Sequence, residues 1–316
     1  MGTPRAGREV TRRLLYVGGV GRSGSTLLEL LLAQTSGVCG VGEIYALWAR
    51  RSDPGAMCGC GQKLSDCPLW RGVLADLGAD PERLYAQQQR VDRTRYAPLL
   101  VAPTMWPPFA RRMRSYLTVL EDLYGAVATR TASSVVIDSS KRPANALLLR
   151  RLRTVDLRVV HLVRDGRAVA YSWTRLRDTE PRPDPSPMVR YSPARICLRW
   201  SMYNLAFSGL RLLGVPVLRL HYEDLVADPR EALSHVAAFA GIDCDLEFLK
   251  DTTAQVDRHA HTVTGNPVRF ARGRIDLVPD EEWRTALPRG KRLAVSLLSW
   301  PLLVRYGYLL GRRRAR

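Results

Sequence analysis

One glycine-rich turn constrains this chain more than any other feature of the sequence. It reads Gly18-Gly19-Val20-Gly21-Arg22-Ser23-Gly24-Ser25-Thr26. The turn follows an apolar run over residues 13–20, which predicts a strand, and it opens a segment with a broad apolar face over 25–34, which predicts a helix. Glycines let the backbone turn sharply and approach a ligand, and the free N–H groups at a helix start favour an anion. The pattern therefore predicts an anion-binding loop after the first strand.

This loop differs from the phosphate loop of ATPases and kinases, G-x-x-x-x-G-K-[ST]. Gly19 and Gly24 have the required spacing, but Ser25 stands where the lysine would be, and the cation is Arg22 inside the loop. A kinase needs that lysine and Mg²⁺ to neutralise the phosphates that it transfers. A P-loop kinase or another nucleotide phosphotransferase is therefore the second hypothesis, and a non-enzymatic basic protein that binds nucleic acid or acidic membranes is the third. For the loop alone, the alternative is a tight turn without a ligand.

Strands and helices alternate along the rest of the chain. We expect strands at 134–138, 157–163 and 216–222, with helices at 144–152, from residue 167 onward and at 228–240. Such alternation is typical of an α/β fold with a parallel sheet. We predict one domain over residues 1–316, a P-loop-type parallel sheet flanked by helices.

Three segments depart from the alternation. Residues 70–130 are expected to form a helical insertion after the first βα unit, and the proline-rich, charged segment 177–193 is expected to form a lid-like loop. Residues 292–316 predict a C-terminal helix and a basic tail. Because Pro301 and Arg305 interrupt the helix, its apolar run is too short to span a bilayer. A buried helix is the first interpretation, and a peripheral membrane contact through this helix is the second.

A second motif, over residues 162–173, reads L-V-R-D-G-R-A-V-A-Y-S-W. Arg164 ends the predicted strand, and Ser172 lies eight residues further, on the next predicted helix. Ligands of open α/β sheets bind at the carboxyl ends of the strands, so these two side chains could hold one phosphate from two sides. Alone, an arginine–aspartate turn before a helix is too common to indicate a site.

Together the two motifs resemble those of PAPS-dependent sulfotransferases, where PAPS is 3′-phosphoadenosine 5′-phosphosulfate. The loop is similar to the family's G-x-x-R-S-G-[ST]-[ST]-L-L segment, which binds the 5′-phosphosulfate, and the second motif is similar to its 3′-phosphate segment. The arginine in the loop looks like the carbohydrate and tyrosylprotein branches. The resemblance implies transfer of a sulfuryl group from PAPS to a hydroxyl or similar acceptor, with PAP as product and no metal required.

The resemblance also implies the site residues. The implied nucleotide contacts are Gly21, Arg22, Ser23, Gly24, Ser25, Thr26, Arg164, Ser172, Tyr222 and Arg269. The implied catalytic residues are Arg22, Lys141 and Glu43. Glu43 lies 21 residues after Arg22, a spacing similar to that of the catalytic glutamate in the tyrosylprotein enzymes.

Other interpretations of these residues stay open. Tyr222 could simply pack at the sheet edge, Lys141 could be solvated at a helix start, and Glu43 could be a surface residue. A histidine could be the base instead, although none matches the family's histidine motif. The histidines are His161, His221, His235, His259 and His261.

A cysteine cluster has no role that the resemblance implies, although similar bacterial sulfotransferase-like sequences carry a comparable C-x-C-G…C-P-x-W segment. Cys58, Cys60 and Cys67 form C-x-C-x6-C, with Cys39 upstream. Zinc sites usually show two paired C-x-x-C turns, and this segment does not. Free or redox-active thiols are the first interpretation and a structural metal the second, so no metal is assigned.

The net charge of the chain limits the classes of partner that it can bind. The formal net charge is +18, almost all from arginine, which suits an anionic ligand, nucleic acid or an acidic membrane. We find no nucleic-acid-binding module and expect no nucleic-acid partner. The polar N-terminus has no apolar signal core, so we expect a cytoplasmic protein. The acceptor is expected to be a small molecule, a carbohydrate or a lipid, with a peptide tyrosine as a further alternative, bound by segments 70–130 and 177–193.

Overall fold

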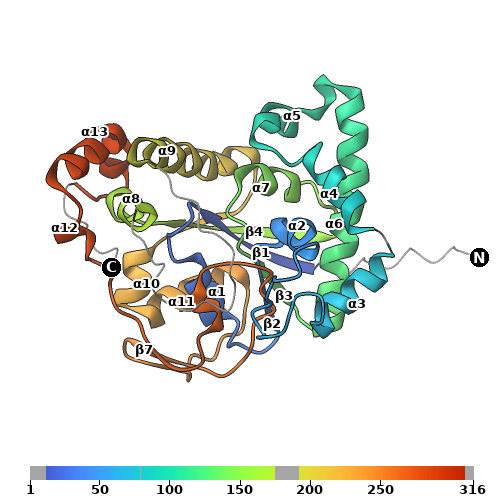
Figure 1. Cartoon of the computed structure of the whole chain (residues 1–316), viewed down its shortest axis with the longest axis horizontal. Coiled ribbons are helices and arrows are strands. Elements are labelled where there is room, and N and C mark those ends of the chain that lie inside the picture. The colour runs from blue at the N-terminus through green and yellow to red at the C-terminus, as the bar shows by residue number, and fades with distance from the viewer. Residues whose placement is uncertain (1–11, 79, 175–191, 310–316) are drawn as a thin grey trace, which may run out of the picture.

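A computed structural model describes residues 12–78, 80–174 and 192–309. Within these residues a five-stranded parallel sheet runs through the centre in the order β2-β3-β1-β4-β5 (Figure 1). Its strands are β1 (Arg12–Gly19), β2 (Val38–Gly42), β3 (Val135–Asp138), β4 (Val155–Val163) and β5 (Val217–His221). The predicted α/β fold with a parallel sheet is confirmed.

The apolar run of the first strand is continuous because both faces of β1 are buried. Leu14 and Tyr16 pack into the core on one face of the sheet, whereas Leu15 and Val17 pack into the core on the other. Parallel sheets covered on both faces typically show such runs in place of alternation. Tyr16 lies opposite Asp138, the last residue of β3, so β1 continues to Gly19 beyond the end of β3.

Helices cover both faces of the sheet, as Figure 1 shows. On one face lie α1 (Ser25–Leu32), α10 (Tyr222–Ala227) and α11 (Pro229–Ala240). On the other lie α6 (Pro107–Thr131), α7 (Pro143–Leu149) and α9 (Pro193–Gly209). The short helix α8 (Gly166–Thr174) follows β4, and α13 (Arg289–Arg305) packs against α8 and α9.

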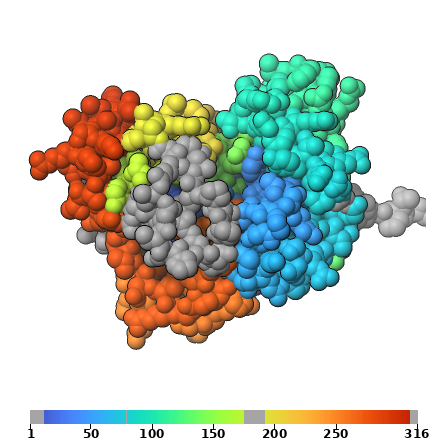
Figure 2. All heavy atoms as spheres, in the orientation of Figure 1, coloured from blue at the N-terminus to red at the C-terminus, as the bar shows by residue number. Residues whose placement is uncertain are grey.

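The 70–130 segment is helical, as expected, but it follows β2 and not the first βα unit. Its further helices are α3 (Pro68–Leu77), α4 (Pro81–Gln89) and α5 (Ala97–Val101), and α2 (Leu47–Arg51) precedes them. In Figure 2 the teal atoms of this insertion form the upper right part of the molecule. The strand β2 was not predicted, because its sequence VCGVG is short and contains two glycines.

A smaller antiparallel sheet follows the last helix of the main sheet. It consists of β6 (Leu249–Lys250), β7 (Thr253–Val256) and β8 (Gly273–Asp276). The connection between β7 and β8 runs along α1 and β2 and carries the Gly265-Asn266-Pro267 turn, and α12 (Trp283–Ala286) follows β8. None of these elements was predicted.

Two expected segments fall partly outside the structure. Residues 177–191 of the lid-like loop and residues 310–316 of the basic tail lie outside the described residues. The last two positions of the loop begin α9, where the Ser192 hydroxyl accepts a hydrogen bond from the Arg195 amide. Among the helices that the structure describes, none is both long and apolar enough to cross a membrane.

Candidate functional site

The glycine-rich turn has the geometry of an anion-binding loop. Gly24 precedes α1 with φ of 90°, and a Cβ at this position would lie 2.4 Å from the Tyr222 ring, so only glycine fits. Arg22 also has a left-handed backbone, with φ of 75°. The first bond of α1 joins the Leu28 amide to the Gly24 carbonyl, so the amides of Ser25 and Thr26 precede the helical hydrogen bonds.

This loop opens into a cavity of about 440 Å³ at the carboxyl ends of the strands. All the predicted site residues except Ser23 and Arg269 line it. These lining residues are Gly21, Arg22, Gly24, Ser25, Thr26, Glu43, Lys141, Arg164, Ser172 and Tyr222. The cavity thus joins the two motifs that the sequence suggested would cooperate, and its cations favour an anionic ligand.

Arg164 lies at the end of β4 with its guanidinium largely buried. One nitrogen donates to the Arg22 carbonyl at 2.9 Å, and another donates to the Asp280 carboxylate at 2.9 Å. The guanidinium also stacks 4.4 Å from the centre of the Tyr222 ring. Ser172, of the same motif, lines the cavity from α8. Asp280, which the sequence analysis did not identify, is therefore the counter-ion of Arg164 at this site.

Lys141 and Glu43 form an ion pair at the same cavity. The Lys141 ammonium group donates to Glu43 Oε1 and to the Ser139 carbonyl, each at 2.7 Å. Lys141 follows β3 and has a left-handed backbone, with φ of 61°. The preceding turn is fixed by Asp138, whose carboxylate accepts hydrogen bonds from the amide and hydroxyl of Ser140. Because Glu43 follows β2 and Lys141 follows the neighbouring strand β3, the two side chains lie next to each other.

Buried carboxyl groups lie behind this pair. Glu29 on α1 accepts hydrogen bonds from the Gly42 amide and the Ser139 hydroxyl, both at 2.5 Å, and so connects α1 with β2 and the end of β3. Burial raises the pKa of Glu29 from 4.5 to about 7, against the opposing effect of these hydrogen bonds. Burial likewise raises the pKa of Asp138 to about 6 and that of Asp92 to about 7.

A C-terminal turn closes one side of the cavity. The Asn266 amide donates to the Thr26 hydroxyl at 3.3 Å, and Gly265, with φ of 155°, lies against the same threonine. On the other side, the Trp173 indole donates to the Gly21 carbonyl at 3.1 Å. The Gly265-Asn266-Pro267 turn resembles the C-terminal loop that closes over the nucleotide in related bacterial members, whereas Trp173 was assigned no role from the sequence. Trp173 could have been suspected because it directly follows Ser172 of the second motif.

Arg269 does not line this cavity, although it follows the turn that does. Its guanidinium is buried, donates to the Met57 carbonyl at 3.2 Å and stacks on Phe270. Arg272 donates to the Gly59 carbonyl at 2.7 Å. Both arginines therefore hold the C-terminal turn against the cysteine-rich segment. Ser23 is a buried residue of the loop and does not line the cavity.

The histidines also lie elsewhere, because no histidine in the described part of the chain lines this cavity. His161 is buried in β4 and shares a 2.8 Å hydrogen bond with Asn204, and burial lowers its pKa to about 4. His221 packs against Tyr306 and Tyr308. His261 contacts the thiols of Cys58 and Cys67. Glu43, by contrast, lines the cavity.

Comparison with known structures agrees with this fold. The sulfotransferase domain of the olefin synthase from Synechococcus PCC 7002 is 22% identical, with a TM-score of 0.50, over 96% of this chain and 98% of that chain. The sulfotransferase STF9 from Mycobacterium avium is 14% identical, with a TM-score of 0.46, over 96% of this chain and 79% of that chain. At these identities the first similarity supports the fold alone, and the second is too low to add to it.

The sequence itself gives the family. No curated protein is similar enough to match the chain. Residues 15–246, which contain both motifs and the sheet, match the family model described as the sulfotransferase family. A match over this much of the chain establishes membership, so the chain belongs to the sulfotransferase family of enzymes.

Proposed function

We propose that this enzyme transfers a sulfuryl group from PAPS to a hydroxyl or similar acceptor by in-line displacement and releases PAP. The observation that carries the proposal is the single cavity that holds Arg22 of the loop, Arg164 and Ser172 of the second motif, and the Lys141–Glu43 pair. Family membership implies PAPS as the donor. The cavity supplies both the cations that such a donor needs and a carboxylate for the acceptor.

The nucleotide contacts follow from the position of each group. The amides of Ser25 and Thr26, at the start of α1, would bind the 5′-phosphosulfate with the help of the helix dipole. Arg164 and Ser172 would bind the 3′-phosphate, and Tyr222 would hold the Arg164 guanidinium in place through their stacking contact. Ser23 and Arg269, which do not line the cavity, would support the loop and the closing turn.

The transfer needs positive charge on the leaving phosphate and a base for the acceptor proton. Arg22 and Lys141 would supply the charge as the bond between sulfur and the bridging oxygen breaks. As the oxygen of the acceptor hydroxyl forms its bond to sulfur, Glu43 would take the proton of that hydroxyl. Lys141 is hydrogen-bonded to the Glu43 carboxylate. This one ion pair would therefore contact both the leaving phosphate and the acceptor hydroxyl. With these cations in place, the proposed transfer needs no divalent metal.

The acceptor is proposed at the level of chemical class. We propose a small-molecule, carbohydrate or lipid hydroxyl, as the arginine-type loop of the carbohydrate branch suggests. The helices between β2 and β3 directly follow Glu43 in the chain, so they are the natural place for an acceptor pocket. The exposed side chains of α13 support the accompanying proposal of a peripheral membrane contact. These are Leu293, Leu297, Leu298 and Trp300.

Calorimetric titration with PAP in buffer without divalent cations tests the donor site, with ATP and Mg²⁺ titrated in parallel. The proposal predicts PAP binding that is lost in Arg164→Ala and retained in Arg195→Ala, an exposed arginine on α9. Binding of ATP–Mg²⁺ without binding of PAP would replace the proposal with a nucleotide phosphotransferase. Confirmed PAP binding would justify an acceptor screen with PAPS.

A further inference from the structure

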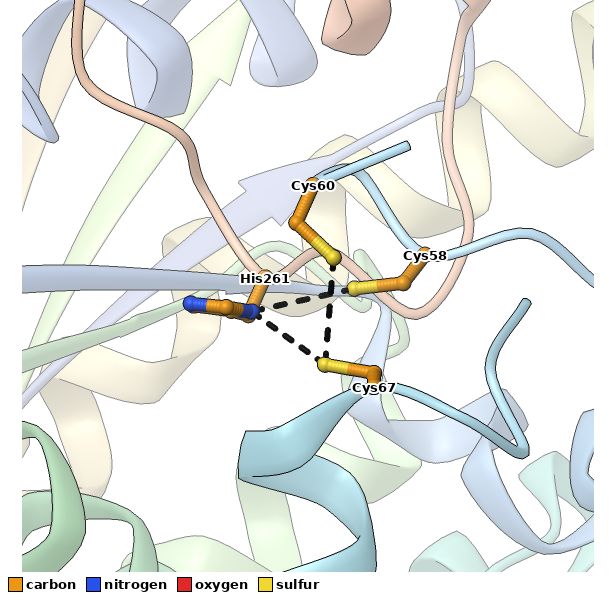
Figure 3. A group of neighbouring side chains, drawn as sticks. All are labelled: Cys58, Cys60, Cys67 and His261. Atoms are coloured by element: carbon orange, nitrogen blue, oxygen red, sulfur yellow. Dashed lines mark hydrogen bonds between the residues drawn. The ribbon is translucent and has the colours of Figure 1, made fainter. Parts of the chain in front are cut away.

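Four potential metal ligands meet next to the candidate active site, and the family assignment does not use them. They are Cys58, Cys60, Cys67 and His261 (Figure 3), and their ligand atoms all lie within 4.8 Å of one another. His261 Nδ1 lies 3.3 Å from the Cys67 sulfur and 3.9 Å from the Cys58 sulfur. The Cys60 and Cys67 sulfurs are 3.9 Å apart. As Figure 3 shows, the three sulfurs and the Nδ1 side of the His261 ring face one another, while the rest of the ring extends away from the thiols.

We propose that these four side chains bind one structural Zn²⁺ ion. Three cysteines and one histidine are an established ligand set for structural zinc, with Zn–S distances of about 2.3 Å. In a tetrahedron, ligands at that distance stand about 3.8 Å apart, and the shorter Zn–N bond brings a nitrogen somewhat closer. The Cys60–Cys67 separation of 3.9 Å and the Cys67–His261 separation of 3.3 Å are close to this arrangement, and the Cys58–His261 separation of 3.9 Å is a few tenths of an ångström longer.

The distances do not fit the alternative of a disulfide. A disulfide needs a sulfur–sulfur distance of about 2.05 Å, about half the distance between Cys60 and Cys67. Any such pair would also leave one cysteine and His261 without a role. Cys58 and Cys67 are fully buried, whereas Cys60 and His261 are partly exposed. Thiols that bind a metal lose their protons, so one ion would satisfy all four ligands together.

The backbone of the C-x-C turn packs closely against the segment that carries His261. Gly59, between the first two cysteines, donates its amide to the Thr262 carbonyl at 3.0 Å. A Cβ at Gly59 would lie 2.3 Å from the Thr262 hydroxyl and 2.6 Å from the Ala260 carbonyl, so a side chain cannot fit there. The C-x-C turn therefore lies directly against the segment that carries His261.

Further hydrogen bonds fix the two outer ligands. The Trp70 indole donates to the His261 carbonyl at 2.9 Å, which holds the histidine segment against the start of α3. Cys67 directly precedes that helix, and its amide donates to the Lys63 carbonyl at 3.0 Å. Such supporting contacts are typical of built metal sites, where the second shell orients the ligands.

The site is structural because all four ligands come from the protein and leave no open position. It joins residues 58–67 to a segment about 200 positions later, which continues directly into Gly265 and Asn266 at the candidate active site. Arg269 and Arg272 reach back to Met57 and Gly59, on the same cysteine-rich segment. The metal would therefore hold the closing turn in place. This consequence rests on the proposed function, whereas the metal site itself does not.

Elemental analysis of the purified full-length protein, made without a metal-affinity tag, tests the site directly. We expect about one zinc per chain, retained in Cys244→Ser and lost in Cys67→Ser. Cys244 is a suitable control because it is half-buried and its thiol is hydrogen-bonded to Thr35, away from the cluster. Zinc at the same level in Cys67→Ser and the wild type would overturn the proposal.

A second measurement decides the case if Cys67→Ser does not fold. Wild-type protein produced with Co²⁺ in place of Zn²⁺ should show the absorption of tetrahedral, thiolate-bound cobalt, and His261→Cys should keep the metal with an altered spectrum. Protein that is free of metal and binds neither ion when reduced would refute the site, as would a disulfide within the cluster. Metal content is measured without nucleotide, so the failure of this proposal and the failure of PAP binding are separate results.

Discussion

The ammonium group of Lys141 lies 2.7 Å from the carboxylate of Glu43, although the two residues are 98 positions apart. Each follows the end of a strand, and the two strands, β2 and β3, are neighbours in the sheet. The pair thus depends on the sheet and not on the insertion between the strands. It also places a proton acceptor next to a cation, as the proposed transfer requires.

Replacing the base should affect the rate more than donor binding. We expect Glu43→Gln to lower the turnover of PAPS about 100- to 10,000-fold, the usual contribution of a general base. PAP affinity should change little, because the carboxylate faces the acceptor side in the proposed mechanism. PAP release in single turnovers and calorimetry measure the two effects. Glu247→Gln, on the exposed surface, serves as the control, and equal rates in the two variants would remove Glu43 from the mechanism.

Lys141 and Glu43 should behave as one unit. We expect Lys141→Met to slow turnover strongly, because it removes a cation from the leaving group and releases the Glu43 carboxylate. The double variant should then be only slightly slower than the more impaired single variant, since residues that act together are not additive. A double-mutant cycle on turnover measures this coupling. Fully additive effects would show that the ion pair has no role in the reaction.

Asp280 should oppose nucleotide binding. Its carboxylate accepts a hydrogen bond from the guanidinium of Arg164, the proposed partner of the 3′-phosphate, and would compete with that phosphate. Because a partly exposed ion pair contributes up to about 1 kcal/mol, Asp280→Asn should tighten PAP binding by up to about fivefold. Arg164→Ala should weaken it about 10-fold or more, as expected for a charged hydrogen bond. Weaker PAP binding in Asp280→Asn would instead show that the carboxylate positions Arg164, and Asp243→Asn on the surface is the control.

Stability should depend on pH through Glu29. The unfolded chain loses this proton near pH 4.5 and the folded protein keeps it to about pH 7, so folding takes up a proton between these values. The contribution is therefore present below pH 4.5 and is lost as the pH rises to about 7, a difference of about 3 kcal/mol. Glu29→Gln should remove this part of the slope in urea unfolding at pH 5 to 8. An unchanged slope would contradict the raised pKa.

The effect of replacing Gly24 of the loop can be distinguished from the effect of replacing another left-handed glycine, Gly78. Gly78, with φ of 55°, has open space around its Cβ position, so Gly78→Ala should cost about 1 to 2 kcal/mol of unfolding free energy and leave turnover unchanged. Gly24→Ala adds a collision with Tyr222 and should displace the loop, lowering the rate about 100-fold. Equal turnover in the two variants would show that the loop does not position the donor.

The local patterns in the sequence predicted most of the main sheet and the cavity. The loop, Arg164 and Lys141 could be placed because each follows a predicted strand, and parallel strands present their carboxyl ends at one edge. Glu43 was named through the family resemblance instead, since β2, the strand that it follows, was not predicted. The position of Arg269 could not be predicted in this way. It depends on how the long connection after β7 folds over the cysteine-rich segment, and no periodicity encodes that path.

The partner of the cysteines shows the same limit. The spacing of Cys58, Cys60 and Cys67 is visible in the sequence, but His261 lies 194 residues beyond Cys67. Asp280 was missed for a similar reason, since its contact with Arg164 arises from the turn between β8 and α12. Contacts of this kind are set by tertiary packing, so the sequence reveals the residue types and not their pairing.

The strand order β2-β3-β1-β4-β5 separates two tasks of the proposed enzyme. The groups proposed to hold the nucleotide follow β1, β4 and β5, whereas Glu43 and Lys141 follow β2 and β3 on the other side of the centre. The helices from α2 to α6 lie between β2 and β3 in the chain, so both of their connections to the sheet are on that second side. Natural variation could therefore exchange these helices, and with them the molecule that is modified, while the half that recognises the common donor stays intact.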